Sequence, residues 1–396
     1  MILTNDNKYE ESRRKQLKID EFNSVEHPFM EQLKELGWND DANEVIELQM
    51  QQLPSDSFRT SFSEVVLMPK LRKALKQIND FLTDSQIDEV ANRITAYQGG
   101  TLLENNECIF NLLVEGTSVS RNEQTGEQSP SVRYIDFDHP ENNIFTAISQ
   151  FKVAIPGTDH HIIPDIVLFL NGLPIVVVEA KSPKVSEPLP EAIDQLMRYS
   201  EQRGDTGEGN PALFQYNQFL IVTCRNEAKA GTITTHREKY FYRWTDPYPM
   251  TLNDLTHGQS APNDQQRLVA GMLSLQNLLD IIRIFTIFSI NDKGKKIKIV
   301  CRYQQFRAVK KMVKRLQKGK TKEDRGGILW HTQGSGKSLT MMFLVRQMQL
   351  ITALQSWKVV FVTDRTQLEE QLGETGGGVG FNLKKAEFIN PRADKP

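Results

Sequence analysis

The sequence of 396 residues is 39% hydrophobic and 25% charged, and it carries a formal net charge of −2. This length exceeds what one ordinary hydrophobic core supports, so the chain is predicted to fold into two or three globular domains. A net charge near zero neither indicates nor excludes a nucleic-acid partner, because the local distribution of charge decides such contacts.

The 3 cysteines lie far apart, without a CxxC pair or a histidine at metal-ligand spacing. Such isolated thiols are typical of a reducing compartment rather than of a disulfide framework. The N-terminus has no apolar signal core, and no stretch approaches the roughly 20 apolar residues that a membrane span needs. We therefore expect a cytoplasmic protein.

The first part of the chain is predicted to be mixed in secondary structure. Residues 1–23 are polar and are expected to form a flexible N-terminus. Apolar residues at helical spacing predict helices over residues 24–38, 63–82 and 85–97. Strands are predicted over residues 108–116, 131–137 and 143–155. The polar residues 117–131 between the first two strands are expected to form a loop or a hairpin tip.

Two apolar runs, residues 163–170 and 173–181, form the centre of the chain. They are apolar on both faces and predict paired strands inside a sheet. The segments expected after them are a helix over 191–202, a buried strand over 218–224, an irregular stretch over 226–263 and a helical bridge over 265–288.

These elements predict an α/β protein of two main domains. A mixed-sheet domain is expected first, followed by a smaller lobe with a parallel sheet. The predicted boundaries are 1–23 for the flexible N-terminus, 24–262 for the first domain, 263–294 for the helical bridge and 295–396 for the partial lobe.

The central pair of strands carries Asp165, Glu179 and Lys181 in the pattern PD…ExK. Hydrolysis of a phosphodiester requires neutralisation of the phosphate and activation of a water, and Mg²⁺ held by carboxylates supplies both. A nearby lysine can orient the water or stabilise developing charge. The alternative is a buried salt-bridge cluster without a metal.

The length of the turn between the two strands tests this interpretation. Asn171-Gly172 predicts a hairpin turn. An unbulged two-residue loop would set Asp165 opposite Val178 and Glu179 on the other face. A three-residue loop, or an equivalent bulge, would set Asp165 opposite Val177 with Glu179 on the same face, and this is the arrangement we predict.

Gln195 and Tyr199, four residues apart on the following helix, complete a recognisable pattern. PDIVLFLNGLPIVVVEAK followed by QLMRYS resembles the RecB-like PD-(D/E)xK nucleases, and in particular the N-terminal nuclease domain of type I restriction enzyme R (HsdR) subunits. The resemblance implies that Asp165 and Glu179 hold Mg²⁺, that Lys181 assists the nucleophile, and that Gln195 and Tyr199 support the site or contact DNA. It also implies a further acidic residue on the first helix, either Glu31 or Glu26.

A P-loop follows in the second part of the chain. GILWH predicts a strand, TQGSG a glycine loop and KSLTMMFLVRQMQ a helix, which is the context of a Walker A motif, although His331 stands where glycine is usual. The segment from Asp292 to Arg325 has 14 Lys/Arg against 3 Asp/Glu, which is usually typical of a solvated helix face. Because it leads into this loop, the other interpretation is a surface that faces a polyanion. The residues expected to bind ATP and its Mg²⁺ are Thr332, Gln333, Gly334, Ser335, Gly336, Lys337 and, as metal ligand, Ser338.

Two further segments resemble superfamily 2 helicases. CRYQQFRAV is similar to the adenine-reading glutamine segment, with Gln304 the preferred reader and Gln305 the alternative; an ordinary amphipathic helix is the other interpretation. KVVFVTD predicts another buried strand, and TDRTQLEEQ resembles a nucleic-acid-contacting motif. The chain ends before an acidic Walker B strand and a second RecA-like lobe, so we expect a fragment with weak ATP binding but no ATP hydrolysis.

The resemblance therefore implies the N-terminal part of a type I restriction R subunit, acting on double-stranded DNA with Mg²⁺ and ATP. Its fold would be a mixed-sheet PD-(D/E)xK nuclease domain followed by an incomplete RecA-like lobe with a P-loop. The resemblance implies methyltransferase and specificity subunits as partners. Two alternatives remain at this point, a helicase-nuclease of DNA repair and a non-catalytic module that docks DNA or partner subunits.

Overall fold

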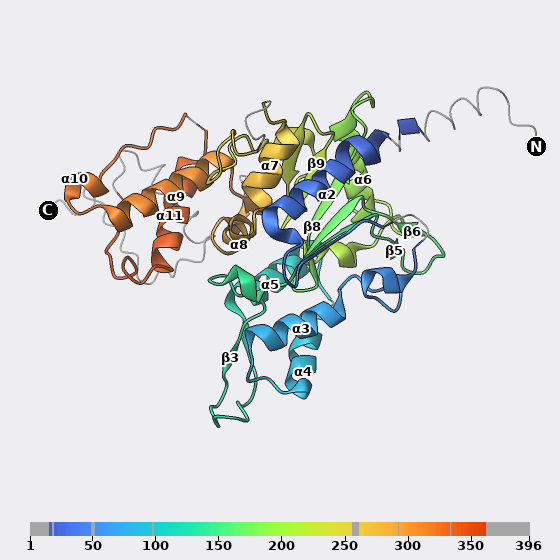
Figure 1. The fold of residues 1–396 in the computed structure, drawn as a ribbon, viewed down its shortest axis with the longest axis horizontal. Helices are drawn as coiled ribbons and strands as arrows, with labels where there is room; N and C mark the ends of the chain where they lie inside the picture. Colours follow the sequence, from blue (N-terminus) through green and yellow to red (C-terminus); the bar gives the residue numbers. More distant parts are fainter. Residues whose placement is uncertain are drawn as a thin grey trace, which may run out of the picture. The chain divides into compact units, whose positions relative to one another are not determined.

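A computed structural model describes residues 16–17, 20–48, 52–96, 99–255, 261–291, 293–332 and 334–361 (Figure 1). The chain divides into two compact units, Met1–Arg283 and Ile284–Pro396, and each is described by itself. No helix among these residues is both long enough and apolar enough to cross a membrane.

A six-stranded mixed sheet forms the centre of the first unit. In spatial order the strands are β1 (Glu44–Ile46), β4 (Phe145–Ser149), β7 (Ile166–Leu170), β8 (Leu173–Ala180), β9 (Phe219–Thr223) and β10 (Ala228–Gly231). Strand β4 is parallel to β1 and antiparallel to β7, and β8 is antiparallel to β7 and parallel to β9. This arrangement confirms the predicted mixed α/β class.

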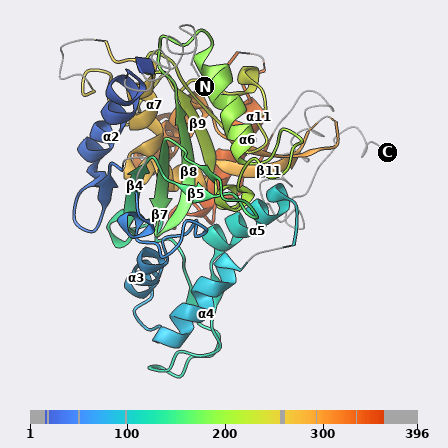
Figure 2. The ribbon, with the colours of Figure 1, turned by 90° about the vertical axis from the view of Figure 1, so that its right-hand side faces the viewer.

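Helices cover both faces of this sheet (Figure 2). Two of them, α2 (His27–Leu33) and α7 (Asp264–Leu273), pack against each other on one side. On the other side α6 (Pro188–Tyr199) packs against β8 and β9, which it connects as a crossover between parallel strands. Because β4, β7, β8 and β9 are buried along their whole length, charged residues at their ends lie in a low-dielectric environment.

The remaining elements of this unit lie beside the sheet. The helices are α3 (Met68–Ile78), in which Pro69 lies in the first turn, α4 (Asp84–Thr95), α5 (Leu102–Glu115) and α8 (Leu275–Arg283). The two small sheets pair β2 (Thr117–Ser118) with β3 (Ser131–Val132), as the predicted hairpin requires, and β5 (Val153–Ala154) with β6 (His161–Ile162).

Three predictions of secondary structure differ from the structure. Residues 108–116 belong to helix α5, not to a strand, because Thr101 and Glu104 form a capping box and the buried residues recur at helical spacing. The predicted strand over 131–137 is limited to Ser131–Val132. The predicted helix over 265–288 is also too long, since α8 ends at Arg283 and a strand begins at Thr286.

The second unit is built on a hairpin and two packed helices. The hairpin pairs β11 (Thr286–Ile290) with β12 (Lys296–Val300), and the helices are α9 (Tyr303–Lys318), the short α10 (Lys322–Arg325) and α11 (Lys337–Gln349). The ring of Phe285 lies 4.9 Å from that of Phe306 on α9 and 5.3 Å from that of Phe343 on α11. These three rings join the hairpin to both helices.

The two strands predicted around the P-loop do not form in the part of this unit that the structure describes. Residues 327–332 and 357–361 have no regular structure, and Ile328 is 99% exposed. A strand needs a hydrogen-bonded neighbour, and no described strand lies beside either segment. The rest of KVVFVTD, the segment TDRTQLEEQ and Gln333 lie outside the described residues.

Candidate functional site

The turn between β7 and β8 is a tight two-residue turn. Asn171 and Gly172 have φ values of 52° and 80°, and Leu170 pairs with Leu173 across them. Positive φ at both central residues is the backbone that an Asn-Gly hairpin turn prefers. The predicted three-residue loop is therefore wrong in its length.

A bulge further along the hairpin supplies the extra residue. The register shifts between Leu168 and Phe169, so that Ile175 on β8 has no partner on β7, and Ile166 then lies opposite Val178. One step further in this register sets Asp165 opposite Glu179. The predicted bulge is confirmed, with a difference of detail: Asp165 lies opposite Glu179 instead of opposite Val177. Both carboxylates lie on one face.

Buried contacts hold the turn in place. The Asn171 side chain accepts a hydrogen bond from the Ile144 N–H at 2.7 Å and donates to the Tyr134 carbonyl at 2.8 Å. Gly172 accepts from the Leu67 N–H at 2.8 Å, and a Cβ at this position would lie only 2.5 Å from the Leu67 carbonyl oxygen. These contacts therefore fix the turn that lies between Asp165 and Glu179 in the chain.

Asp165 is the centre of a buried acidic cluster. The Ala180 N–H donates to its Oδ2 at 2.7 Å, and the Gln150 amide donates to its Oδ1 at 3.3 Å and to Glu26 Oε2 at 2.8 Å. Ligand oxygens of Asp165, Glu26 and Glu21 all lie within 4.8 Å of one another. The acidic cluster, defined here as Glu21, Glu26, Asp165 and Glu179, thus brings four carboxyl groups from three parts of the chain together.

A π-helical turn brings two of these carboxyl groups to one side. Residues Phe22–Glu26 form η1, in which the His27 N–H donates to the Phe22 carbonyl five residues earlier. Residues five apart point in different directions on an α-helix, but this wider turn sets Glu21 and Glu26 on the same face. The Ser182 N–H, which follows β8, holds Glu21 by donating to its Oε2 at 3.0 Å.

Lys181 is the cation of this site. Its Nζ donates to Glu179 Oε1 at 2.8 Å and to the Ala180 carbonyl at 2.9 Å. Burial alone would lower the pKa of Lys181, but the charges of Glu179 and Asp165 raise it above its ordinary value. The ammonium group therefore stays protonated.

Burial raises the pKa of every carboxyl group in the acidic cluster, and the charge of Asp165 raises the pKa of the other three further. Burial, and after it the charge of Asp165, raises the pKa of Glu21 to about 7 and that of Glu26 to about 8. The same two causes raise the pKa of Glu179 well above its ordinary value, and burial raises the pKa of Asp165. Without a counter-ion, the cluster is therefore costly to ionise.

The residues present fit a hard divalent cation. The Oε2 atom of Glu179 is buried and has no hydrogen-bond partner among the described residues. Four carboxyl groups face one ammonium group, and a buried excess of negative charge is costly unless a cation or protons neutralise it. Carboxylate oxygens are the ligands that Mg²⁺ prefers. Asp165, Glu179, Glu26 and Glu21 could hold such an ion.

Gln195 and Tyr199 lie on one face of α6, as predicted, and they contact each other. The Gln195 amide donates to the Tyr199 hydroxyl at 2.6 Å, and that hydroxyl donates to the Ile163 carbonyl at 3.3 Å. Burial, and then the charges of Glu179 and Asp165, raise the pKa of Tyr199. The pair fixes the backbone two residues before Asp165.

Of the two acidic residues named as alternatives on the first helix, Glu26 lies in the acidic cluster and Glu31 does not. Glu31 forms an ion pair with Lys34 at 2.6 Å and belongs to a separate, largely exposed group with His27 and Glu47. Glu21 and Gln150 were not predicted from the sequence. The only signal for Glu21 is an acidic residue five positions before Glu26, which indicates a shared face only if the π-helical turn is known.

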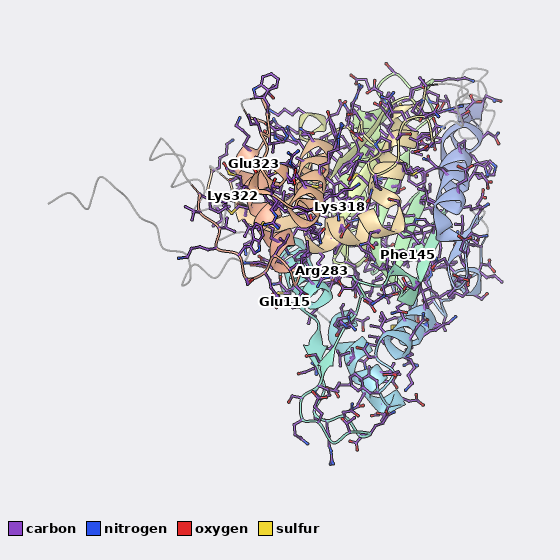
Figure 3. The ribbon with its side chains drawn as sticks, turned by 60° about the vertical axis from the view of Figure 1, so that its left-hand side comes forward. Glu115, Phe145, Arg283, Lys318, Lys322 and Glu323 are labelled. Atoms are coloured by element: carbon purple, nitrogen blue, oxygen red, sulfur yellow. The ribbon has the colours of Figure 1, made fainter. Side chains whose placement is uncertain are left out.

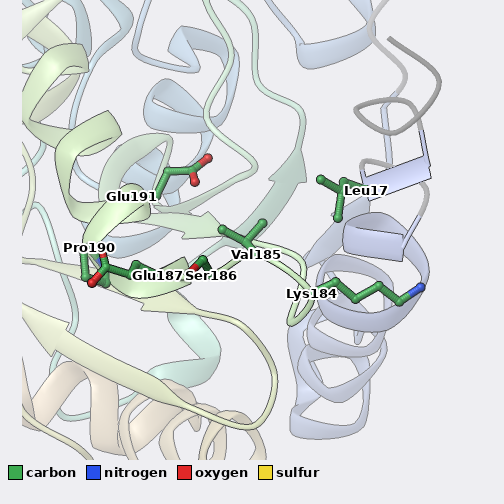
Figure 4. Close-up of a pocket in the computed structure, with 7 residues that line it drawn as sticks. All are labelled: Leu17, Lys184, Val185, Ser186, Glu187, Pro190 and Glu191. Atoms are coloured by element: carbon green, nitrogen blue, oxygen red, sulfur yellow. The ribbon is translucent and has the colours of Figure 1, made fainter. Parts of the chain in front are cut away.

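A pocket of about 460 Å³ lies between Leu17 and the residues that follow β8 (Figure 4). Its lining comes from the N-terminal segment and from the connection between β8 and α6, with Lys184 paired to Asp20 at 2.5 Å. The lining residues are Leu17, Lys184, Val185, Ser186, Glu187, Pro190 and Glu191. The charge of Glu191 acts on Glu21, so the pocket lies next to the carboxylates.

The P-loop of the second unit forms the turn that precedes α11. Gly334 and Gly336 have φ values of 75° and 81°, and α11 begins at Lys337 as predicted. The Lys337 ammonium donates to the carbonyls of Thr332 at 3.1 Å and His331 at 3.3 Å. Ser335 also donates to the Thr332 carbonyl, and Ser338 lies in the first turn of α11.

The two candidate glutamines at the start of α9 differ in their contacts. Gln305 is buried, accepts from the Arg302 N–H at 2.8 Å and donates to the Gly336 carbonyl at 3.1 Å. It therefore caps α9 and fastens it to the P-loop. The Oε1 atom of Gln304 has no partner among the described residues.

Comparisons with known proteins find two matching families, one in each part of the chain. Residues 18–239 match the family described as the N terminus of the type I restriction enzyme R protein, and residues 304–389 match the SWI2/SNF2 ATPase family. The first match covers more than half of the chain and includes the whole acidic cluster and Lys181.

Among curated proteins, the chain is similar to endonuclease subunits of type I restriction enzymes. It is 31% identical to the HindI endonuclease subunit of Haemophilus influenzae, and the matched region covers 89% of this chain and 32% of that subunit. It is 29% identical to the putative MjaIXP endonuclease subunit of Methanocaldococcus jannaschii, and the matched region covers 95% of this chain and 36% of that subunit. The chain thus spans about a third of the length of these curated relatives. It belongs to the family of type I restriction enzyme R proteins and matches their N-terminal part.

Proposed function

We propose that this chain contains the metal-dependent nuclease site of the R subunit of a type I restriction enzyme, and that its substrate is double-stranded DNA. One observation carries the proposal. The bulge at Ile175 sets Asp165 opposite Glu179, with Lys181 bonded to Glu179, in a buried site that has more carboxyl groups than cations.

In this proposal Asp165 and Glu179 hold Mg²⁺, with Glu26 and Glu21 as further ligands. The bound ion would neutralise the scissile phosphate and lower the pKa of a water molecule. Because Lys181 stays protonated, it acts as a hydrogen-bond donor and positive charge, and not as a general base. It would orient the attacking water and stabilise the negative charge that develops on the phosphate.

Gln195 and Tyr199 are positioning residues in this mechanism. Their hydrogen bonds reach the backbone at Ile163 and not the Asp165 carboxyl group. The pocket beside Glu21 and Glu191 supports an approach of the DNA backbone along the connection between β8 and α6. Lys184 is the cation that lines this pocket.

For the second unit we propose ATP binding. The backbone of Thr332–Gly336 would surround the phosphates at the N-terminus of α11, Lys337 would contact the β- and γ-phosphates, and Ser338 would hold Mg²⁺. In an R subunit this lobe would contribute to ATP-driven movement along DNA, together with methyltransferase and specificity subunits.

Cleavage of supercoiled plasmid with Mg²⁺ or Mn²⁺, without ATP, tests the nuclease proposal. We expect metal-dependent nicking by the unaltered chain and a loss of at least about 100-fold in Glu179→Ala and in Lys181→Ala. The control is Glu31→Ala on α2, which removes an exposed carboxylate outside the acidic cluster and should nick normally. Nicking that persists in Glu179→Ala would overturn the assignment of the site.

A further inference from the structure

Helix α9 carries an unusual set of charges for a surface helix. It has no acidic residue, and its cations follow one another at intervals of three and four positions. They are Arg307, Lys310, Lys311, Lys314, Arg315 and Lys318. Like charges at these spacings repel each other on a helix, so this composition does not stabilise α9.

Four of these cations form one stripe. Arg307, Lys311, Lys314 and Lys318 follow the spacing i, i+4, i+7 and i+11, which places them on one face of the helix, and all four are exposed. We refer to these four residues as the basic stripe. Figure 3 shows Lys318 in the region of α9 and α10, with Lys322 and Glu323 of α10 nearby.

The other face of α9 packs into the core of the second unit. Phe306, Val309 and Val313 are buried there, and α9 packs against α11. The orientation of the basic stripe is therefore fixed by apolar packing. The side chains of the basic stripe face solvent because the opposite face of α9 is buried against the core.

Another lysine-rich helix shows how the charges of such a helix can be neutralised. In α3, Lys70 pairs with Glu44 and Arg72 pairs with Asp88 at 2.9 Å. In contrast, no carboxylate of the described residues forms an ion pair with Lys314 or Lys318. The positive charge at this end of α9 is thus available to a partner.

We propose that the basic stripe of α9 binds the phosphate backbone of duplex DNA, independently of base sequence. From Arg307 to Lys318 the stripe spans about 16 Å, at about 1.5 Å per residue. Over that length one strand of duplex DNA displays about five phosphates. Lysine supplies a flexible point charge rather than a bidentate donor for base edges, so the contact favours phosphates over sequence.

The basic stripe is distinct from the nucleotide site of the same unit. Gln305, at the start of α9, is the residue bonded to the P-loop at Gly336. Lys318 lies at the other end of the helix, about 20 Å further along at about 1.5 Å per residue. A nucleotide held by the P-loop therefore does not neutralise the far end of the stripe. The choice of DNA as the polyanion rests on the proposed function.

Fluorescence anisotropy of a labelled DNA duplex, titrated with the full chain over a series of KCl concentrations, tests the proposal. EDTA is present throughout, so the result does not depend on cleavage. Each lost phosphate contact lowers the slope of log K against log [salt] by about 0.9 and weakens binding roughly eightfold near 0.1 M salt. We expect this change in Lys314→Gln and about twice the change in slope in the variant Lys314→Gln/Lys318→Gln.

The matched control is Lys73→Gln, which removes an exposed lysine from α3 and should leave both slope and affinity unchanged. Thermal unfolding of each variant verifies that it is folded, and removal of like charges from α9 should not lower its unfolding temperature. Duplex binding by Lys314→Gln/Lys318→Gln with unaltered slope and affinity would overturn the proposal. Because the assay omits metal, a failure of plasmid nicking with intact stripe-dependent binding would count against the nuclease site alone.

Discussion

Asp165 and Glu179 share one face of the β7–β8 hairpin because Ile175 adds a residue to β8 that has no partner on β7. Without this bulge, the tight turn at Asn171-Gly172 would direct Glu179 to the opposite face of the sheet. A single irregularity in a buried hairpin therefore creates the carboxylate pair on which the proposed chemistry depends.

Replacement of Gly172 by alanine should disrupt the hairpin at its turn. The new Cβ would lie 2.5 Å from the Leu67 carbonyl oxygen and 2.8 Å from the Leu71 nitrogen, at a φ of +80°. We expect a loss of about 3 kcal/mol or more in the free energy of unfolding, measured by urea denaturation. Gly207 has the same φ but nothing within 4 Å of an added Cβ, so Gly207→Ala should cost only about 1 kcal/mol. Equal losses in the two variants would contradict this account of the turn.

The metal-free protein should become less stable as the pH rises from about 5 to 8. The pKa values of Glu21 and Glu26 rise on folding from an ordinary 4.5 to about 7 and about 8. Between these values the native state binds more protons than the unfolded chain, so the free energy of unfolding falls with increasing pH, by up to about 1.4 kcal/mol per pH unit for each group. Thermal unfolding in EDTA at several pH values measures this slope.

The variant Glu21→Gln/Glu26→Gln should flatten this pH dependence, whereas Glu31→Gln should retain it. Mg²⁺ should stabilise the unaltered chain more at pH 8 than at pH 6, because ionised carboxylates bind the ion and protons compete with it. A metal-free stability that is constant between pH 5 and 8 would show that the carboxyl groups do not repel each other as the structure indicates.

Lys181→Met should separate metal binding from cleavage. The four carboxyl groups remain, so the chain should still bind Mn²⁺, but the donor beside the reacting phosphate is lost. We expect at least about a 100-fold decrease in plasmid nicking. The control is Lys73→Met, which removes an exposed lysine of α3 outside the site and should nick normally. Full nicking by Lys181→Met would remove this residue from the mechanism.

The two glutamines at the start of α9 should respond differently to alanine. Gln305→Ala loses both the cap of α9 and the bond to Gly336, so the unfolding temperature should fall, with a loss of about 1–2 kcal/mol. Gln304→Ala should remain as stable as the unaltered chain while losing preference for ATP over GTP. Nucleotide binding by fluorescence and thermal unfolding of both variants check this assignment. If neither variant loses its preference for ATP over GTP, CRYQQFRAV is an ordinary amphipathic helix.

Local patterns in the sequence predicted much of the first unit. The apolar runs before and after Asn171-Gly172, the helix that carries Gln195 and Tyr199, and the need for a bulge all follow from periodicity and parity, and the structure has each of them. The bulge itself could be placed only by excluding other registers, because no residue type marks Ile175 as the unpaired one.

Other features depend on contacts that no local pattern shows. Residues 108–116 are mostly apolar, as the residues of a buried strand would be. Only the capping box at Thr101 and Glu104 indicates that they form a helix. Glu21 joins the site through a π-helical turn and a bond from the Ser182 backbone, which is distant in sequence. The strand predicted before the P-loop lacks a described neighbour to pair with, and strand propensity alone does not replace that neighbour.

A calorimetric titration of Mn²⁺ into the metal-free chain tests the central claim most directly, since it asks whether the acidic cluster is a cation site. The account predicts saturable binding that is lost in Glu179→Gln, strengthened as the pH rises from 6 to 8, and unchanged in the exposed control Glu31→Gln. Equal binding by the unaltered chain and Glu179→Gln, or none by either, would contradict it and would favour a salt-bridge cluster in a non-catalytic docking module.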